Sequence, residues 1–171
     1  MPAVKDFRTL AFDVARVDDS GKDLGGTVYW RLYAIENVVR VIAHSILTAE
    51  FASAAWWSRG VDGKIRRRID DRKADHTSQP WHTKPGRHDI YYAQLPELTK
   101  IVASNSNLFR PLIPKIDELV KRLEEIRLPR NVVGHMNWLS AKDRQRIDVV
   151  YSEIQALMNR LSRSGLTILI P

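Results

Sequence analysis

Apolar residues recur at the three- and four-residue spacing of helices along most of the chain. The segment from Thr27 to about Arg59 contains neither Gly nor Pro and is followed by Gly60, which predicts one long helix. A second helix is expected behind Pro114, where the apolar positions are Ile116, Leu119, Val120, Leu123 and Ile126. A shorter helix is expected to start at about Pro96.

The last predicted helix begins after Ser140, an N-cap residue with Asp143 three positions on, and ends at Gly165. Its apolar positions are Ile147, Val150, Tyr151, Ile154, Leu157, Met158 and Leu161. The final residues TILIP are expected to form either a short strand or a tail packed on the core. No other segment predicts a strand.

The remaining segments are polar. Residues 61–90 form a basic insertion after the first long helix, expected to be half helix and half loop. In residues 1–26, FRTLAFDVARV is compatible with a short helix, and VDDSGKDLGG is typical of a turn or linker. We therefore predict an all-α fold, in which residues 27–171 form one bundle of four or five helices and residues 1–26 have no assigned structure.

Composition narrows the functional classes. The chain has no cysteine, which excludes disulfides, a thiol nucleophile and a Cys-based zinc site, and which suits a cytoplasmic protein. Charges interrupt the apolar runs, so we expect no membrane span and no secretory signal. The net charge is +7, and arginine supplies most of it. Arginine is suited to phosphate oxygens, which leans towards nucleic acid, although a merely basic surface explains the charge equally well.

The stretch LPRNVVGHMNW, residues 128–138, combines a phosphate-binding and an acid–base residue. Arg130 and His135 are separated by four residues, between two amphipathic segments and behind Pro129. Residues five apart on a regular helix point about 140° away from each other. They therefore meet only if the helix is distorted, if the arginine side chain wraps around, or if two copies face each other across a dimer.

RNVVGH resembles the R-x4-6-H motif of the HEPN superfamily, small helical domains of which many are metal-independent endoribonucleases. Asn131 matches the polar residue that follows the arginine there. The resemblance extends to the order of the segments ENVVR, AAWW, YYAQLPELTKIV and KIDELVKRLEEIRLPRNVVGHMNWLSAKD. It implies a HEPN-type bundle that forms a homodimer with both motifs at the interface.

The chemistry that the resemblance implies suits these residue types. Histidine, with an ordinary pKa of about 6.5, serves as acid or base near neutral pH, so His135 is the expected catalyst. Arg130 would hold the phosphate oxygens, and Asn131 would orient the histidine or contact the phosphate. The products would be a 2′,3′-cyclic phosphate and a 5′-OH, with no metal or cofactor. Asn137 stands where toxin members of the family carry a modified tyrosine, so that form of neutralisation is not expected.

Tyr33, Glu36, Arg40 and His44 share one polar face of the first long helix. Glu36 and Arg40 are either a simple ion pair one turn apart or a buried pair that supports the active site. In the insertion, basic side chains and one aromatic ring suggest binding of single-stranded RNA, whereas interspersed aspartates suggest a solvated helix. The RNA-binding candidates are Arg66, Arg67, Arg68, Arg72, Lys73 and Trp81.

Two further groups are interpreted as structural. Trp56 and Trp57 are expected to pack in the core or in an interface. The spacing of His76, His82 and His88 matches no common metal site, so no bound metal is expected.

The sequence thus predicts a homodimeric, metal-independent endoribonuclease acting on RNA, in bacterial defence or toxin–antitoxin biology, with an antitoxin or defence-system partner. The alternatives are a non-catalytic HEPN module that binds RNA, nucleotide or protein, and a helical adaptor for an acidic protein.

Overall fold

The computed structural model describes residues 6–51 and 55–171, and within these ranges the fold is all-helical with no strand. The all-α prediction is confirmed. The helices of the bundle and its N-terminal extension are η1 (Phe7–Thr9), α1 (Val14–Leu24), the π-helical turn η2 (Gly25–Tyr29), α2 (Trp30–Phe51), α7 (Ile116–Glu125), α8 (Arg127–Gly134) and α9 (Ala141–Arg163). The remaining elements are α3 (Trp56–Gly60), α4 (Gly63–Ser78), η3 (Asp89–Tyr92), α5 (Leu95–Ser104) and α6 (Ser106–Phe109).

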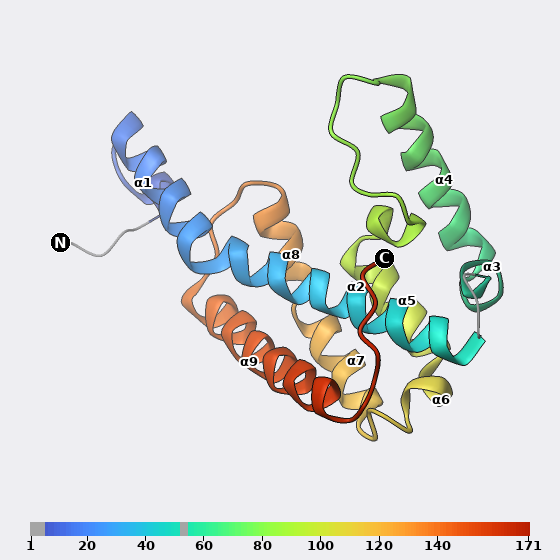
Figure 1. Ribbon diagram of the computed structural model, residues 1–171. Helices are drawn as coiled ribbons and strands as arrows, with labels where there is room; N and C mark the ends of the chain where they lie inside the picture. Colours follow the sequence, from blue (N-terminus) through green and yellow to red (C-terminus); the bar gives the residue numbers. More distant parts are fainter. Residues whose placement is uncertain (1–5, 52–54) are drawn as a thin grey trace.

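The central element of the bundle is α2. It packs lengthwise against α9 and also contacts α5 (Figure 1). Its buried residues occupy several sides of the helix, as expected for a helix surrounded by others. They are Leu32, Ile35, Val39, Arg40, Ile42, Ala43, Ser45, Ile46 and Leu47. Because Arg40 is buried among apolar residues, its charge must be compensated inside the fold.

The prediction that VDDSGKDLGG is a turn or linker is wrong. Asp13 caps α1, which runs through this segment and joins α2 through η2. A tertiary contact holds the junction: Nη1 of Arg144 on α9 lies 2.7 Å from the Asp23 carboxylate and 2.8 Å from Oγ1 of Thr27. The long helix therefore begins before Thr27 and is last described at Phe51; residues 52–54 of its predicted span lie outside the described residues. The prediction that it runs to about Arg59 is wrong, because Trp56–Gly60 form the separate helix α3, which begins after Ala55.

The continuous helix Val14–Phe51 contains an 18-residue window with a mean hydropathy of 1.2, long and apolar enough to cross a membrane. We expected no such run from the sequence. Half of this window is buried inside the fold, and the core helix of a soluble protein meets the same criteria. The window is thus weak evidence for a membrane span.

Both ends of α9 are fixed by local signals. Oγ of Ser140 accepts a hydrogen bond from the backbone N–H of Asp143, and Gly165 follows α9 with a φ of 83°, as predicted. The C-terminal tail runs back to α2, where the N–H of Leu169 donates to Oγ of Ser45 at 2.9 Å. Of the two expectations for TILIP, the tail is confirmed.

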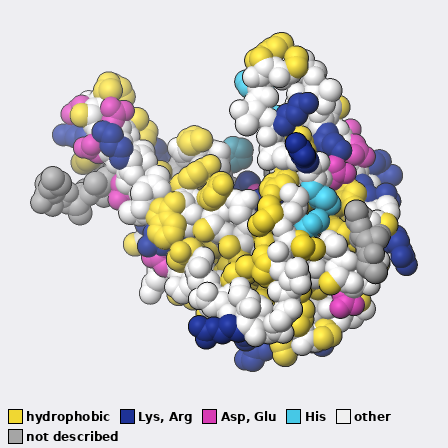
Figure 2. Space-filling view, viewed as in Figure 1, with side chains coloured by type: hydrophobic (Ala, Val, Ile, Leu, Met, Phe, Trp, Pro, Cys, Tyr) yellow, Lys and Arg dark blue, Asp and Glu magenta, His cyan; other side chains and the backbone are white. Residues whose placement is uncertain are grey.

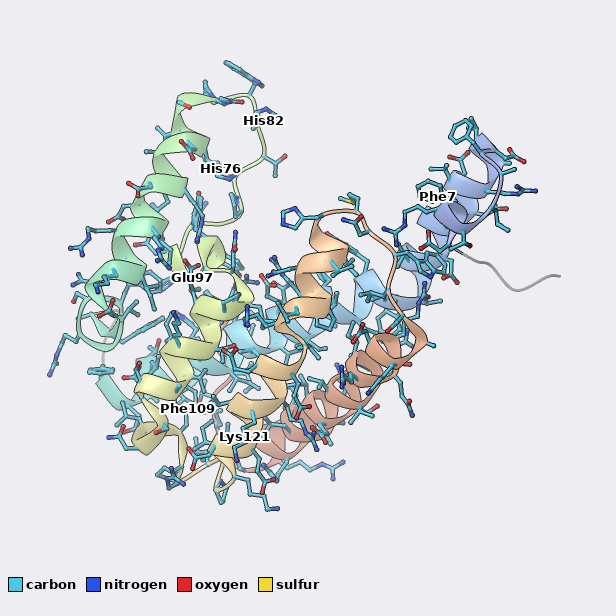
Figure 3. All side chains as sticks on the ribbon, turned by 180° about the vertical axis from the view of Figure 1, so that it is seen from behind. Phe7, His76, His82, Glu97, Phe109 and Lys121 are labelled. Atoms are coloured by element: carbon cyan, nitrogen blue, oxygen red, sulfur yellow. The ribbon has the colours of Figure 1, made fainter. Side chains whose placement is uncertain are left out.

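The basic insertion forms a lobe, consisting of α4 and the loop that follows it, and this lobe projects from the bundle (Figure 1). The prediction of half helix and half loop is confirmed. Glu97 on α5 lies at its base (Figure 3), and both Nη atoms of Arg72 donate to the Glu97 carboxylate at 2.7 Å. Although burial opposes it, Arg72 holds the pKa of Glu97 below its ordinary value. The pair anchors the lobe to the bundle.

Candidate functional site

The motif residues lie on α8 and at its end. Pro129 cannot donate a backbone hydrogen bond to Glu125, so α7 ends there and the chain turns at Ile126 into α8. In α8 the proline occupies the first turn, where backbone N–H groups have no helical acceptor. The break therefore orients α8, and with it Arg130, independently of α7.

His135 is the C-cap residue of α8. The next residue, Met136, has a φ of 57°, a left-handed conformation that normally favours glycine. Its N–H donates to the carbonyl of Val133, and that of Asn137 donates to the carbonyl of Val132, which is the Schellman pattern. The side chain of Met136 is 84% exposed. The helix thus ends in a strained turn next to the candidate catalytic residue.

Glu36 connects two arginines from different helices. Its Oε1 accepts from Nη2 of Arg40 at 3.1 Å, and its Oε2 accepts from Nε of Arg130 at 3.4 Å. The Glu36–Arg40 pair is therefore both a pair one turn apart on α2 and a partly buried support for Arg130 on α8. Of the sequence-predicted site residues, these three are brought together.

The two arginines differ in their freedom to bind a ligand. Arg40 is only 6% exposed, and it donates to the carbonyls of Ile90 and Ala93 and to Oδ1 of Asn37. In the described part of the chain, the Nη atoms of Arg130 donate to no protein group, and its side chain is one-quarter exposed. Nη1 lies 3.5 Å from where a Cβ on Gly134 would be, so the guanidinium folds back towards the end of α8. Arg130 thus retains free donors for an anion.

A pocket of about 520 Å³ opens beside this charged group, between α2, α8 and the loop before η3. Its volume is in the range of small-molecule sites. The polar and charged lining residues are Glu36, Asn37, Arg40 and Arg130. The other lining residues, mainly apolar and aromatic, are Tyr29, Leu32, Tyr33, Pro85, Tyr91, Val133, Gly134 and Met136. Figure 2 shows the molecule hollowed between α1 and the lobe, on the side to which α8 points.

The far wall of the pocket depends on a close approach of Gly86, in the loop, to Tyr91, in η3. A Cβ on Gly86 would lie 2.3 Å from the ring of Tyr91, so only glycine lets the loop pack on that ring. The guanidinium carbon of Arg40 lies 5.8 Å from the centre of the same ring. The loop of the insertion is in this way built into the pocket.

His135 and Asn131 do not line the pocket in their own chain. His135 is exposed, Asn131 is half-buried, and neither side chain makes a hydrogen bond within the described residues. The Nδ2 of Asn137 donates to the carbonyl of His135 at 2.8 Å, which fixes the backbone there. Within one chain, the imidazole of His135 and the free donors of Arg130 therefore do not share a cavity.

The RNA-binding candidates of the lobe differ in whether their side chains are available to a ligand. Arg72 pairs with Glu97, and Lys73 pairs with Asp89 at 2.5 Å. Arg66 is half-buried, whereas Arg67, Arg68 and Trp81 are exposed. These exposed side chains are the ones available to a ligand, and they belong to no pocket wall around Arg130.

The tryptophans predicted to be structural and two of the three spaced histidines lie in different parts of the molecule. Trp56 is fully buried in the core, as predicted, and Trp57 packs against it. His76 and His82 lie on the lobe, with His82 near its tip (Figure 3). Among the described residues, no group of three or more His, Cys, Asp or Glu side chains could hold a metal ion.

His88 belongs to an aromatic cluster with His44 and Trp56. The His88 ring stacks on Trp56 at 5.3 Å and meets the His44 ring edge-on at 4.7 Å. Nδ1 of His44 is buried, and no described residue forms a hydrogen bond with it. Burial, followed by the neighbouring His88, lowers the pKa of His44 to about 4, and burial also lowers the pKa of His88. Both rings are therefore neutral near pH 7.

Acidification is expected to destabilise the protein through this cluster. Between pH 6.5 and about 4 the unfolded chain binds a proton at His44 that the folded chain does not, so stability falls as pH falls through this window. Because solvent reaches part of the ring, we expect a loss of about 1–2 kcal/mol from His44. Urea unfolding at several pH values measures it. His44→Gln should reduce the loss, whereas the exposed-loop control His82→Gln should not; an equal loss in all three proteins would contradict this assignment.

The chain matches no known family model, and no curated protein or solved structure shows significant similarity to it. The site must therefore be interpreted from its own geometry.

Sequence reasoning missed several pocket residues. Tyr29, the last residue of η2, lies one turn before Tyr33 on the same side of the continuous helix, so the same helical spacing would have found it. Pro85, Tyr91 and Met136 reach the pocket through the path of a loop and the end of a helix, for which the sequence carries no periodic signal.

Proposed function

We propose that this protein is a HEPN-type, metal-independent endoribonuclease that acts as a homodimer. The observation that carries the proposal is Arg130, a partly buried arginine supported by Glu36, with free donors at a pocket next to the helix end that bears His135. A phosphate held by Arg130 would lie beside the end of α8, whose C-cap residue is the exposed His135. Arginine and histidine are sufficient for cleavage that uses the 2′-OH of RNA as its nucleophile.

In the proposed reaction, a base removes the proton of the 2′-OH, and the 2′-oxygen attacks the adjacent phosphorus. The P–O2′ bond forms and the P–O5′ bond breaks, leaving a 2′,3′-cyclic phosphate. The 5′-oxygen takes a proton and leaves as a 5′-OH. His135 is the proposed acid–base group, Arg130 stabilises the charge on the phosphoryl oxygens, and Asn131 orients the histidine or contacts the phosphate.

The position of His135 outside its own pocket supports the dimer. Leu128 is 61% exposed, and together with Met136 it places apolar surface on both sides of the motif. In a two-fold interface over this surface, each His135 would face the Arg130 of the other chain. Each active site would then contain residues from both subunits.

Electrostatics favour an anionic substrate. Around the pocket two arginines face one carboxylate, and the whole chain carries a net charge of +7. Arg67 and Arg68 add exposed positive charge on α4, which suits a phosphate backbone that extends beyond the pocket. We place this activity in the cytoplasm, in defence or toxin–antitoxin biology, with a partner that keeps the nuclease silent.

The proposal is tested by incubating the purified protein with a mixed tRNA and mRNA pool in excess EDTA. We expect cleavage, with products that end in 2′,3′-cyclic phosphate and 5′-OH. Cleavage that EDTA abolishes, or products with a 5′-phosphate, would contradict the mechanism. RNA binding without cleavage would favour the second candidate, a non-catalytic HEPN module; the exposed Arg67 and Arg68, which lie outside the pocket, are the observation on its side.

A further inference from the structure

The mouth of the pocket carries two tyrosines that the proposed chemistry does not use. Tyr33 is 63% exposed and Tyr29 is 56% exposed, although both line the pocket. They lie one turn apart on the same side of the continuous α1–α2 helix, and neither takes part in a ring-stacking contact within the described ranges. Large aromatic surfaces left open beside a polar site are typical of binding sites.

The polar residues of the pocket wall that belong to α2 follow the tyrosines along the same helix. Glu36 and Asn37 come one turn after Tyr33, which corresponds to about 5 Å along the axis. The side-chain amide of Asn37 is already hydrogen-bonded: its Nδ2 donates to the carbonyl of Tyr33 at 2.8 Å, and its Oδ1 accepts from Arg40 at 2.6 Å. Arg130 on α8 retains free donors, and the two tyrosines line the same pocket. A nucleotide whose phosphate meets Arg130 would therefore have aromatic surface within the same pocket.

We propose that Tyr33, with Tyr29 beside it, forms a base-stacking subsite next to the phosphate position at Arg130, so that the substrate is an unpaired nucleotide in single-stranded or looped RNA. This inference rests on the proposed function, since it places the RNA in the same pocket. A stacked base must leave its own helix, so a continuous duplex does not fit the subsite. The assignment also moves base stacking from Trp81 on the lobe to α2.

The experiment measures binding rather than cleavage, and it uses the His135→Ala protein so that RNA stays intact. Fluorescence anisotropy gives Kd for a short labelled single-stranded RNA, for the same RNA annealed to its complement, and for a version with abasic positions. Base–aromatic stacking contributes about 1–3 kcal/mol per base, so adding Tyr33→Leu is expected to weaken binding of the single strand by about 5- to 100-fold.

The controls separate the ring from the fold and from other aromatic surfaces. Tyr33→Phe keeps the ring and should bind within about twofold of the parent. Trp81→Leu removes a ring that is 77% exposed but outside the pocket, and it should leave Kd unchanged. The abasic RNA should bind the parent and the Tyr33→Leu variant equally, because it has no base to stack.

Four results would overturn the inference: unchanged binding of the single strand by Tyr33→Leu, an equal loss with the abasic RNA, equal affinity for the duplex, or a loss confined to Trp81→Leu. Competition by a free mononucleotide at the affinity of the RNA would also overturn it, in favour of a nucleotide site. If the wild type cleaves no RNA but binding depends on Tyr33 as described, the stacking subsite stands and the proposed catalysis fails.

Discussion

Replacing His135 by alanine is expected to slow RNA cleavage by about 10²- to 10⁴-fold, the usual contribution of general acid–base catalysis. The imidazole is exposed, and its side chain makes no hydrogen bond within the described residues, so the folded state loses no internal hydrogen bond. Stability should therefore stay within about 0.5 kcal/mol of the wild type. Single-turnover cleavage rates and a urea unfolding curve on the same protein measure both quantities.

The matched control is His82→Ala, which removes an exposed histidine from the tip of the lobe. It should cleave at the wild-type rate. RNA binding by His135→Ala should be close to that of the wild type, since phosphate binding is assigned to Arg130. If the alanine variant cleaves as fast as the wild type, His135 is not the catalyst and the proposed chemistry is wrong.

The sequence was sufficient to predict the helices whose ends have local signals. Ser140 and Gly165 delimit α9 because an N-cap hydroxyl and a left-handed glycine act within a few residues. The segment 17–26 was mispredicted because its Asp, Ser and Gly residues favour a turn locally, whereas contacts of Arg144 with Asp23 and Thr27 hold it in a helix. Such a contact joins residues more than a hundred positions apart, and no local pattern contains it.

The candidate site likewise has a part that the sequence predicts and a part that it does not. Helical spacing placed Tyr33, Glu36 and Arg40 on one face, because periodicity alone determines which residues share a side of a helix. The contact of Glu36 with Arg130 joins residues 94 positions apart. It depends on how α8 packs near α2, and the break before Pro129 sets the direction of α8. The position of His135 outside the pocket agrees with helical spacing, which turns residues five apart about 140° away from each other. The left-handed turn at Met136, by contrast, is not signalled by the sequence.

Two inactive variants are expected to restore activity when they are mixed, if each active site combines Arg130 of one chain with His135 of the other. Arg130→Ala alone should lower cleavage by about 10²- to 10³-fold, the cost of removing a donor that stabilises transition-state charge. It should fold normally, because Glu36 keeps its contact with Arg40. His135→Ala alone is inactive for the reason given above.

After unfolding and refolding together in equal amounts, half of the dimers would contain one chain of each variant. In each of these dimers one site carries both substitutions and the other carries neither. The mixture should therefore recover about a quarter of the wild-type rate. As a control, the double variant Arg130→Ala/His135→Ala mixed with wild type would form mixed dimers in which every site has lost one residue. Half of the dimers are then mixed and inactive, and a further quarter contain only the double variant. That mixture should therefore show about a quarter of the rate of an equal total amount of wild-type protein. If the activity of the mixture stays as low as that of the single variants, Arg130 and His135 of the same chain act together, and a site shared between chains is excluded.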